Sequence, residues 1–471
     1  MDFEAIQALP PGRAATATPR YDDDLVPARG ESARLKPHLA RRAADSGLEV
    51  WHGEDDDPQV EARSGSRRFR NVEGPSIQSS DSMRLALIAT LLPSDSPGGA
   101  EAYVDAAAHA LAERHDIVVL TGSNGSLNGI PTRHLPHLPQ LDRRRTRVAK
   151  LLWHAADQWL PTVHFALVRE LKALRPDIVL THHPQGLSAA VFTAIAQVGL
   201  PHVHTAHDLN LLCTRMTMTR NGEFCGGRCL DCRIQRTIRG GAIRLELSRL
   251  IGVSRYICER HVRAGVVPAE RALLLRLGAL PGPARLRKVD GDTVTLGFIG
   301  TLAPHKGVRT LLAAMHSTDE PWRLVLAGAG PLEAEVRSAA LDDDRIEYLG
   351  QVVGSAKDAF FDRCDLIVIP SEWEEPATFV AVEAAVRGIP TVVSARGGLT
   401  EAPEARTFRS GAPHELVGAV RWYLEDPRRV EDASARLLAA GEEYEWATHV
   451  RRLEAILDEV RHERPARHGR G

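Results

Sequence analysis

The feature that most constrains the fold is an apolar run that passes through a loop directly into a helix. The run Asp365–Ile369 is short and almost wholly apolar, as expected of a strand buried in a parallel sheet. From Phe379 to Val386, apolar residues recur at three- and four-residue spacing, which predicts a helix, and Gly388 predicts its end. A strand that leads through a loop into a helix is the unit of a parallel α/β sheet, whose ligands bind beyond the carboxyl ends of the strands.

The loop and the start of this helix carry two carboxylates, Glu375 and Glu383, with seven residues between them. The backbone N–H groups of Phe379 and Val380 open the helix, and a helix N-terminus attracts anions. A phosphate can therefore dock between two acids that each accept sugar hydroxyls. This layout predicts a nucleotide-sugar site, with one acid for the ribose, one for the transferred sugar and the amides for the diphosphate.

Strand–loop–helix units recur along the chain from Met83 onward, which predicts doubly wound parallel sheets. In the first half, the glycine turn Gly98–Gly99 follows a strand and precedes a helix. Two further strands end at His182–His183 and at His207–Asp208. In the second half, the loop Gly300–Gly307 has the same place between a strand and a helix. All these loops are expected at the carboxyl edges of the sheets.

Several of these motifs match one known family in order. Residues 375–384 read EPATFVAVEA, similar to E-P-F-G-L-V-x-x-E-A, and residues 300–307 read GTLAPHKG, similar to G-R-L-x-x-x-K-G. With the His-Asp pair and the glycine turn, the chain resembles the retaining glycosyltransferases of the GT4 family over roughly residues 83–460. The resemblance implies an α/β GT-B fold, in which two Rossmann-like doubly wound domains face a central cleft and a C-terminal helix crosses back.

Three positions depart from the family pattern. Thr301 stands where the family has arginine, Ala377–Thr378 replaces Phe-Gly, and Arg276–Ala279 replaces an Asn-Gly turn. The loss of the arginine places more of the diphosphate charge on Lys306 and on backbone amides. The side chain at Thr378 must be tolerated where the backbone approaches phosphate.

The resemblance implies a role for each matched residue. Catalytic roles fall on Glu375 at the donor-sugar hydroxyls, Lys306 at the diphosphate and His207 at the sugar. Donor-binding roles fall on a larger set: Glu383 at the ribose, with Thr378, Phe379, Val380, Thr301, Gly98, Gly99, Gly330 and Val352. The acceptor side is assigned to Asp208, Gly397 and Gly398.

The activity implied is metal-independent transfer of a hexose-type sugar, with retention, from a nucleotide-diphosphate sugar to a hydroxyl acceptor. The acceptor class stays open between a glycan, a lipid-linked molecule and a small molecule. Two alternatives remain: a GT-B nucleotide-sugar epimerase, which needs no acceptor, and a non-catalytic nucleotide-sugar-binding protein. The second alternative stays open because Thr301 replaces the family's arginine and Thr378 replaces its glycine.

Composition and motif order predict five segments. Residues 1–82 lack sustained periodicity and are predicted to be disordered. The others are an acceptor domain at 83–284 with a Cys-rich loop at 213–232, a nucleotide-sugar domain at 285–445, a crossover helix at 446–464 and a polar tail at 465–471. The stretch Pro281–Asp292 has the composition of an interdomain linker.

The Cys-rich loop carries four cysteines in the spacing C-x11-C-x3-C-x2-C, namely Cys213, Cys225, Cys229 and Cys232. Four thiolates this close suit a closed tetrahedral zinc site, and free buried thiols are the alternative. Cys258 and Cys364 stand in apolar surroundings and are predicted to lie in the core.

Residues 143–159 combine basic side chains with Trp153 and Trp159, which is typical of a helix on an anionic membrane surface. An ordinary helix with its tryptophans in the core is the equal alternative. The net charge of −2 argues against a nucleic-acid partner. No apolar run approaches the ~18 residues of a membrane span, and the start MDFEAIQALPPG does not resemble a signal peptide, so we expect a cytoplasmic protein, membrane-associated at most.

Overall fold

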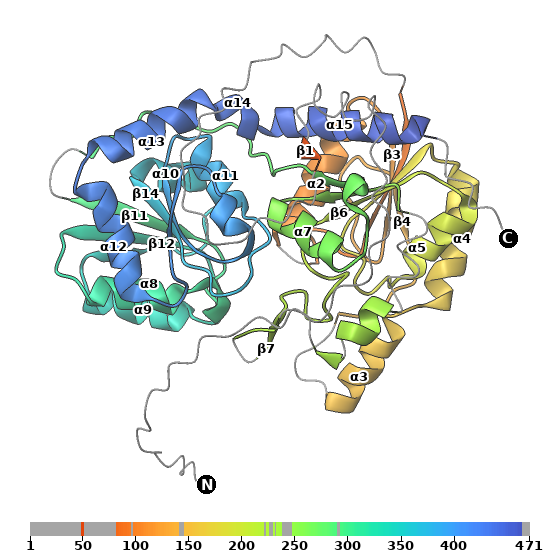
Figure 1. Ribbon diagram of the computed structural model, residues 1–471, viewed down its shortest axis with the longest axis horizontal. Coiled ribbons are helices and arrows are strands. Elements are labelled where there is room, and N and C mark those ends of the chain that lie inside the picture. Colours follow the sequence, from red (N-terminus) through yellow and green to blue (C-terminus); the bar gives the residue numbers. More distant parts are fainter. Residues whose placement is uncertain are drawn as a thin grey trace, which may run out of the picture.

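The computed structural model describes residues 49–50, 82–95, 98–140, 146–220, 223–225, 229–230, 232–237, 247–289 and 293–463. These residues form two α/β lobes side by side, with the earlier half of the chain in one lobe and most of the later half in the other (Figure 1). Each lobe contains one large sheet, and helices cover its faces (Figure 1).

The first domain contains an eight-stranded sheet in the order β1-β10-β9-β6-β5-β2-β3-β4. Every neighbouring pair is parallel except β1–β10. The strands are β1 (Glu49–Val50), β2 (Arg84–Ala89), β3 (Asp116–Thr121), β4 (Thr132–His134), β5 (Ile178–Thr181), β6 (His202–Ala206), β9 (Arg249–Gly252) and β10 (Ala272–Leu274). A separate ribbon pairs β7 (Thr219–Arg220) with β8 (Glu223–Phe224). The order reverses between β2 and β5, so their carboxyl ends mark the ligand crevice of this sheet.

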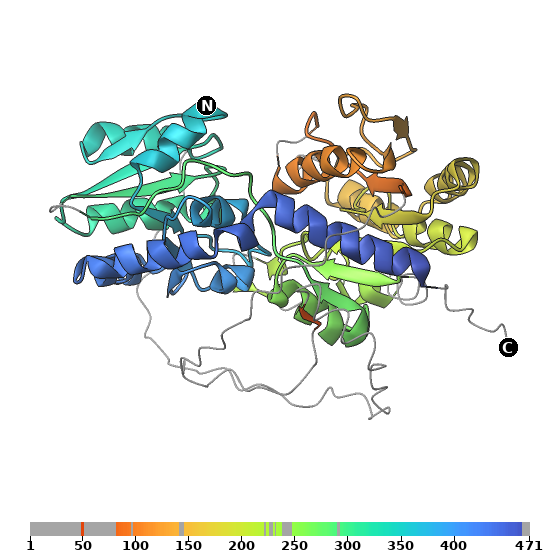
Figure 2. The ribbon, with the colours of Figure 1, turned by 90° about the horizontal axis from the view of Figure 1, so that it is seen from above.

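The helices of the first domain include one from the end of the chain. They are α2 (Gly99–Ala112), α3 (Arg147–Ala156), α4 (Pro161–Leu174), α5 (Ala190–Val198), α7 (Arg255–Arg263), the short η1 (Ala269–Arg271) and α15 (Trp446–His462). Seen from above, α15 runs across the first domain, although the chain reaches it from the second (Figure 2). The predicted crossover helix is confirmed.

The second domain contains a six-stranded parallel sheet in the order β13-β12-β11-β14-β15-β16. Its strands are β11 (Val294–Ile299), β12 (Trp322–Ala327), β13 (Ile346–Tyr348), β14 (Leu366–Ile369), β15 (Thr391–Ser394) and β16 (Ala405–Phe408). Counted within the domain this is the order 3-2-1-4-5-6 of a Rossmann sheet, whose switch point lies between β11 and β14. Lys306 follows β11 and Glu375 follows β14, so the two predicted catalytic residues flank that switch point.

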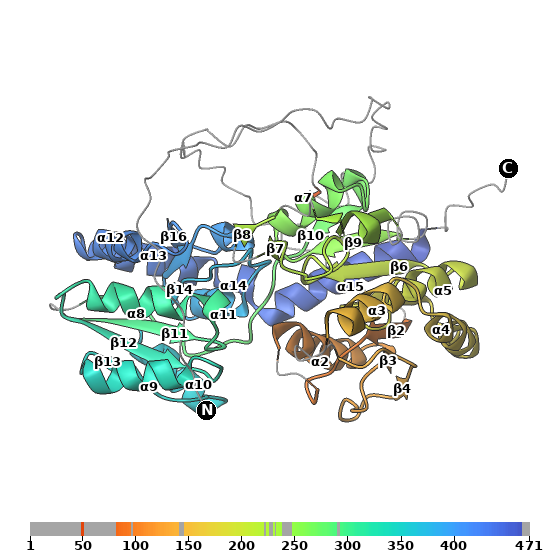
Figure 3. The ribbon, with the colours of Figure 1, turned by 90° about the horizontal axis from the view of Figure 1, so that it is seen from below.

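Helices cover both faces of the second sheet. They are η2 (Pro304–Lys306), α8 (Val308–His316), α9 (Glu333–Asp342), α10 (Ser355–Arg363), α11 (Phe379–Ala385), η3 (Gly397–Glu401), α12 (Pro413–Leu424), α13 (Arg428–Ala439) and α14 (Gly441–Tyr444). From below, α11 lies on the side of the second domain that faces the first (Figure 3). Val382 of α11 and Val386, its C-cap residue, pack into the core of the first domain, which fixes α11 between the lobes.

The two faces of β2 show why the first domain has two cores. Leu85 and Leu87 point into the core that contains α15, while Ala86 and Ile88 point into the opposite one. Such a strand is buried on both faces, which explains its unbroken apolar sequence. The helix α15 adds Leu453, Ile456, Leu457 and Val460 to the first of these cores, and all four are fully buried.

The structure describes parts of the predicted extension and linker. Within the predicted disordered extension, Glu49–Val50 pairs antiparallel with Leu273–Leu274 at the sheet edge, while residues 1–48 and 51–81 lie outside the described residues. The predicted linker packs on the second domain at Arg287, which is 1% exposed and donates to the carbonyl of Asp362 at 3.0 Å. The polar tail at 465–471 lies outside the described residues.

In the predicted basic segment 143–159, the observed helix is shorter than predicted, and the two tryptophans differ in exposure. Helix α3 begins at Arg147, because Thr146 caps the amide of Ala149. Trp153 is buried and donates from Nε1 to the carbonyl of Pro139 at 2.8 Å, whereas Trp159 is 41% exposed. Trp153 is therefore a core residue, and residues 141–145 lie outside the described part.

Candidate active site

Helix α11 and the loop before it place the two predicted carboxylates. The helix begins at Phe379 because the hydroxyl of Thr378 accepts from the amide of Val380 at 3.3 Å. Gly388, at φ = 70°, ends the turn after it, as predicted. Thr378 is therefore the N-cap of α11, which was not predicted from the sequence. The amide of Val380 was expected to bind phosphate, but in the structure it donates to the Thr378 hydroxyl.

Glu375 lies at the centre of a buried cluster of donors. Its carboxylate accepts both contacts of the Lys306 ammonium, at 2.9 and 3.0 Å. It also accepts from Ser371 Oγ at 2.9 Å and from Trp373 Nε1 at 2.6 Å. Three of these contacts fall on Oε2 and only one on Oε1, so Oε1 keeps an acceptor position for a further donor. The carboxylate predicted for sugar hydroxyls is thus mostly engaged within the protein, and its side chain is only 7% exposed.

The backbone packs tightly at the turn that contains Lys306, and this brings Lys306 close to Glu375. It is the last residue of η2, and Gly307 after it has φ = 72°. A Cβ atom on Gly307 would stand 1.8 Å from the carbonyl oxygen of Pro370, so only glycine fits. This close approach joins the loop after β11 to the loop after β14. The side chain of Lys306 keeps 24% exposure, which leaves the cation accessible to a ligand.

His207 follows β6 and is held by a second histidine. Its Nε2 lies 3.1 Å from Nδ1 of His182, and the two rings are stacked. Burial lowers the pKa of His207 to about 3 and also lowers the pKa of His182 well below its ordinary value. Both rings are therefore neutral near pH 7, and one donates the shared proton to the other. His207 can act as a hydrogen-bonding group toward a sugar, but not as a cation.

A neighbouring aromatic group connects His207 to the crossover helix. The ring of Tyr103 on α2 meets that of His207 edge-on at 4.6 Å, and its hydroxyl lies 2.8 Å from Nε2 of His449 on α15. His449 Nδ1 lies 2.7 Å from the carbonyl of Arg276, which can only accept. Nδ1 therefore carries the hydrogen, and Tyr103 donates to Nε2. The sequence analysis missed both residues, because no motif marks this pairing.

Asp208, which the resemblance assigns to the acceptor side, pairs with His183. Asp208 Oδ2 lies 2.7 Å from His183 Nδ1, and Oδ1 accepts from the amide of Asn210 at 2.6 Å. Burial lowers the pKa of His183, but the charge and hydrogen bond of Asp208 outweigh it and raise that pKa overall. Burial raises the pKa of Asp208, and His183 outweighs this too, so that pKa is lowered. Between about pH 4 and pH 6.5 both groups are therefore charged.

Replacing Asp208 by asparagine is expected to destabilise the protein by about 1.5–3 kcal/mol near pH 5–6, where both partners are charged. The raised pKa of His183 gives stability that is complete below about 6.5 and is lost as the pH rises through its folded value. The lowered pKa of Asp208 gives stability present above about 3.9 and lost as the pH falls through its folded value. Thermal unfolding of both proteins across this pH range measures the difference.

The matched control is Asp105→Asn, because Asp105 pairs with His109 at 3.1 Å on the surface, where the side chains are 42% and 45% exposed. An exposed pair contributes little, so this variant should stay within about 0.5 kcal/mol of the wild type. A destabilisation by Asp208→Asn that does not change with pH would contradict the charged pair.

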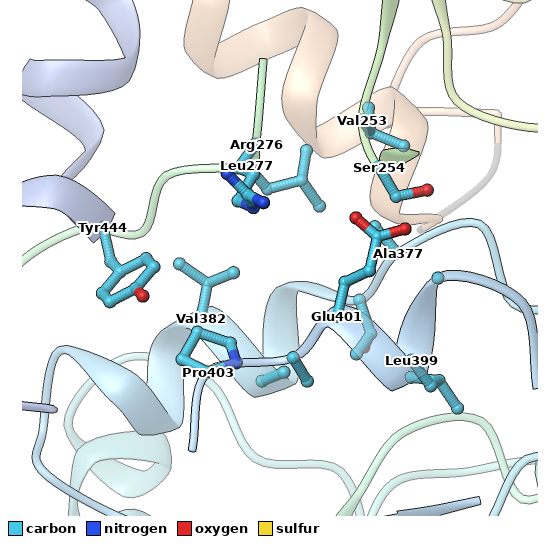
Figure 4. A pocket seen from close by; sticks show the side chains of 14 residues that line it. Val253, Ser254, Arg276, Leu277, Ala377, Val382, Leu399, Glu401, Pro403 and Tyr444 are labelled. Carbon is cyan, nitrogen blue, oxygen red and sulfur yellow. The ribbon is translucent and has the colours of Figure 1, made fainter. Parts of the chain in front are cut away.

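Contacts between the domains bring the loops after β9 and β14 together. Ser254 Oγ donates to the carbonyl of Pro376 at 2.6 Å. Glu401 of η3 accepts from the amides of Arg255 and Tyr256, at 2.8 and 2.7 Å, and so caps α7 of the other domain. Figure 4 shows the carboxylate of Glu401 pointing toward Ser254 across a crevice between the domains. This crevice also holds Thr378, but its lining does not include Lys306, Glu375, Glu383 or His207.

The remaining predicted residues divide between the two sides of the cleft. A Cβ atom on Gly99 would stand 3.4 Å from the ring of Phe379, so the glycine turn of the first domain lies beside the start of α11. Gly397 and Gly398, assigned to the acceptor side, pack closely on the loop after β14, because added Cβ atoms would meet the backbone oxygens of Glu375 and Pro376 at 2.4 and 2.0 Å. The others are Thr301, which is exposed, Gly330, beside the loop after β11, and Gly98 and Val352, which are half-buried.

The cysteines of the predicted zinc site do not form one in the described residues. Cys213 is fully buried, and a hydrogen bond with Cys232 is the main cause that lowers its pKa to about 7. The thiol of Cys225 instead turns to the carbonyl of Met218, at 3.0 Å. Within the described ranges, no group of three or more histidine, cysteine or acidic side chains is placed to bind a metal. Cys258 and Cys364 lie in the core, as predicted.

Comparison with known proteins agrees with this geometry. The family model described as Glycosyltransferase Family 4 matches residues 97–275, and that described as Glycosyl transferases group 1 matches residues 293–426. An uncharacterised 42.6 kDa protein in the cps region of Klebsiella pneumoniae is 26% identical over 338 residues, which cover 68% of this chain and 87% of that protein. The D-inositol 3-phosphate glycosyltransferase 1 of Catenulispora acidiphila is 26% identical over 309 residues, 59% of this chain and 71% of that one.

Among solved structures, Anabaena HepE in complex with UDP aligns with a TM-score of 0.60 and 18% identity. The alignment covers 80% of this chain and 100% of HepE. One family model matches the first domain and the other matches the second. The two parallel sheets and the crossover helix agree with the GT-B fold that the resemblance implied. The chain belongs to the group 1 glycosyltransferases of family 4 and has their two-domain GT-B fold.

Proposed function

We propose that this chain moves a hexose-type sugar, with retention of configuration, from a nucleoside-diphosphate sugar to a hydroxyl acceptor. The observation that carries the proposal is the pair of Lys306 and Glu375 at the switch point of the second sheet. A partly exposed cation held there is suited to a diphosphate, because the crevice outside a switch point is where such sheets bind nucleotides. HepE, of the same fold, has been solved with UDP and with UDP-glucose.

In this proposal, Lys306 stabilises the charge that builds on the leaving diphosphate, and Glu375 positions the ammonium group before the donor arrives. Oε1 of Glu375 accepts a single contact, from Lys306, so it can accept a sugar hydroxyl while the contacts on Oε2 remain. Glu383 is assigned to the ribose, and the neutral His207 to a sugar hydroxyl. Transfer then follows a front-face displacement, in which the leaving phosphate takes the proton of the incoming hydroxyl.

Incubation with a panel of nucleotide-sugars, with and without acceptors, tests the proposal. Sugar transfer that depends on an acceptor supports it. Interconversion of the donor sugar without an acceptor identifies an epimerase, and thermal stabilisation by a nucleotide-sugar without turnover identifies a binding protein. Either of the last two results contradicts transferase activity.

The exposed face of α3 supports the proposal that this protein meets its acceptor at a membrane surface. Val148, Leu151 and Leu152, at helical spacing, are 67%, 70% and 65% exposed. Contiguous exposed apolar groups mark interaction surfaces, and the basic run at 143–145 precedes them in the sequence. The membrane proposal thus rests on these aliphatic side chains and not on Trp153. Among the described residues, no helix is long and apolar enough to cross a bilayer.

Changing Leu151 and Leu152 together to glutamate is expected to abolish co-sedimentation with vesicles that contain phosphatidylglycerol. Changing Arg143, Arg144 and Arg145 to glutamate should do the same at low salt, since each basic group near such a surface contributes about 1 kcal/mol and salt screens it. Leu341→Glu is the control, because Leu341 is 88% exposed on α9 of the other domain. If all variants sediment like the wild type, α3 is an ordinary surface helix.

A further inference from the structure

Beside the ribose-binding acid lies a lysine that the sequence analysis did not single out. Lys357 on α10 places its Nζ 2.5 Å from Oε1 of Glu383 on α11. The side chains are 33% and 19% exposed, so the pair is partly buried and still open to a ligand. Oε2 of Glu383 makes no hydrogen bond within the described part of the chain.

A second ion pair fixes the geometry of the first. Asp358, the next residue along α10, accepts from Arg387 at 2.6 Å, and Arg387 also donates to the carbonyl of Glu383 at 3.0 Å. The guanidinium of Arg387 is packed over the ring of Phe361 at 4.8 Å, and its side chain is only 7% exposed. Helices α10 and α11 are thus joined by two adjacent charged contacts. The two helices that carry Lys357 and Glu383 are therefore fixed relative to each other.

We infer that Lys357 is a second residue of the ribose site to which Glu383 is assigned, and that it determines preference for ribonucleotides over 2′-deoxynucleotides. The inference rests on the proposed function, because it needs a nucleoside diphosphate at this edge of the sheet. Each ribose hydroxyl has one hydrogen to donate and lone pairs that accept. A carboxylate only accepts, and an ammonium group only donates, with three N–H bonds. The pair therefore satisfies both capacities of a hydroxyl, which neither side chain does alone.

The position of Lys357 along the chain agrees with this role. It lies five residues after Val352, which the family resemblance assigns to the nucleotide base, and its partner Glu383 is assigned to the ribose. The group between a base pocket and a ribose acid is suited to contact the sugar of the nucleotide. Hydrogen bonds that involve a charged group contribute more than neutral ones, so loss of one is measurable as affinity.

Isothermal titration of the full chain with UDP, ADP and GDP, each beside its 2′-deoxy form, tests the inference. The wild type is expected to bind at least one ribonucleotide about tenfold or more tightly than its deoxy form. Lys357→Met should weaken binding of that ribonucleotide by about tenfold and lower the ratio of ribonucleotide to deoxynucleotide affinity several-fold. The reason is that the substitution and the loss of the 2′-hydroxyl remove the same contact. Lys357→Arg keeps a donor and a charge and should keep most of the ratio.

Lys288→Met is the matched control, since Lys288 pairs with Glu431 at 2.9 Å on the surface of the same domain, with 52% and 39% exposure. This variant should change neither the affinity for the ribonucleotide nor the affinity for its deoxy form. Melting temperatures of all variants show whether Lys357→Met is folded, and Lys357→Arg repeats the test with the charge retained. Binding with an unchanged ratio in Lys357→Met overturns this assignment alone. Failure of every nucleoside diphosphate to bind the wild type overturns the proposed function and this assignment with it.

Discussion

Replacing Lys306 by methionine is expected to lower kcat/KM for sugar transfer roughly 10²–10³-fold, the loss seen when one preorganised charge-stabilising donor is removed. The reason is specific to this chain, in which Thr301 stands where the family pattern has an arginine. In the proposed mechanism Lys306 is then the main side-chain cation at the diphosphate, and Glu375 contacts it at 2.9 Å before the donor binds. Initial rates with a saturating acceptor and a varied donor concentration measure the effect.

The same change also leaves a buried carboxylate without its cation, so loss of folding must be separated from loss of chemistry. Lys306→Met alone should lower the melting temperature, because an unpaired buried charge is costly. Adding Glu375→Gln removes that charge and should restore much of the melting temperature while transfer stays low. Recovery of transfer in the double variant would contradict the electrostatic role of Lys306.

Replacing Leu457 by alanine is expected to destabilise the first domain by about 2–5 kcal/mol, although the residue lies close to the end of the described chain. Leu457 on α15 is fully buried in one core with Leu85 and Leu87 of β2. Removal of the side chain leaves a cavity that this core cannot easily fill. Hydrogen exchange should therefore speed up in β2 and leave β11, in the other domain, nearly unchanged.

Arg451→Ala serves as the control on the same helix, because Arg451 is exposed and bonds Thr448 of its own helix at 2.7 Å. A surface change of this kind stays within about 0.5 kcal/mol. Exchange that speeds up equally in β2 and β11 after Leu457→Ala would mean that α15 stabilises both domains alike.

Sequence patterns predicted the architecture because local periodicity and chain order determine it. The apolar run at 365–369 became β14, and Phe379, Val382 and Val386 predicted the position of α11 within a residue or two. Lys306 and Glu375 follow strands on either side of the switch point, so topology alone brought them close. For these residues the site follows from where the strands end.

Side-chain pairing across elements was not predictable in the same way. Nothing in the sequence shows that Ser371 and Trp373 donate hydrogen bonds to Glu375, or that Lys357 on another helix pairs with Glu383. Cysteine spacing predicted a zinc site, but spacing does not determine where sulfur atoms point, and Cys225 turned to a backbone carbonyl. Likewise, composition marked residues 143–159 as amphipathic without showing that Trp153 packs inward. Tertiary geometry decides each of these contacts.

The most direct test of the central claim is to follow turnover of the nucleotide-sugar panel by proton NMR, observing the anomeric signals and the released nucleotide together. The account predicts that one donor yields a nucleoside diphosphate and a glycoside in equal amounts, only with an acceptor present. It also predicts that the glycoside has the anomeric configuration of the donor. A product of the opposite configuration would contradict the retaining mechanism, and absence of nucleotide release from every donor, with folded protein and acceptor present, would contradict sugar transfer itself.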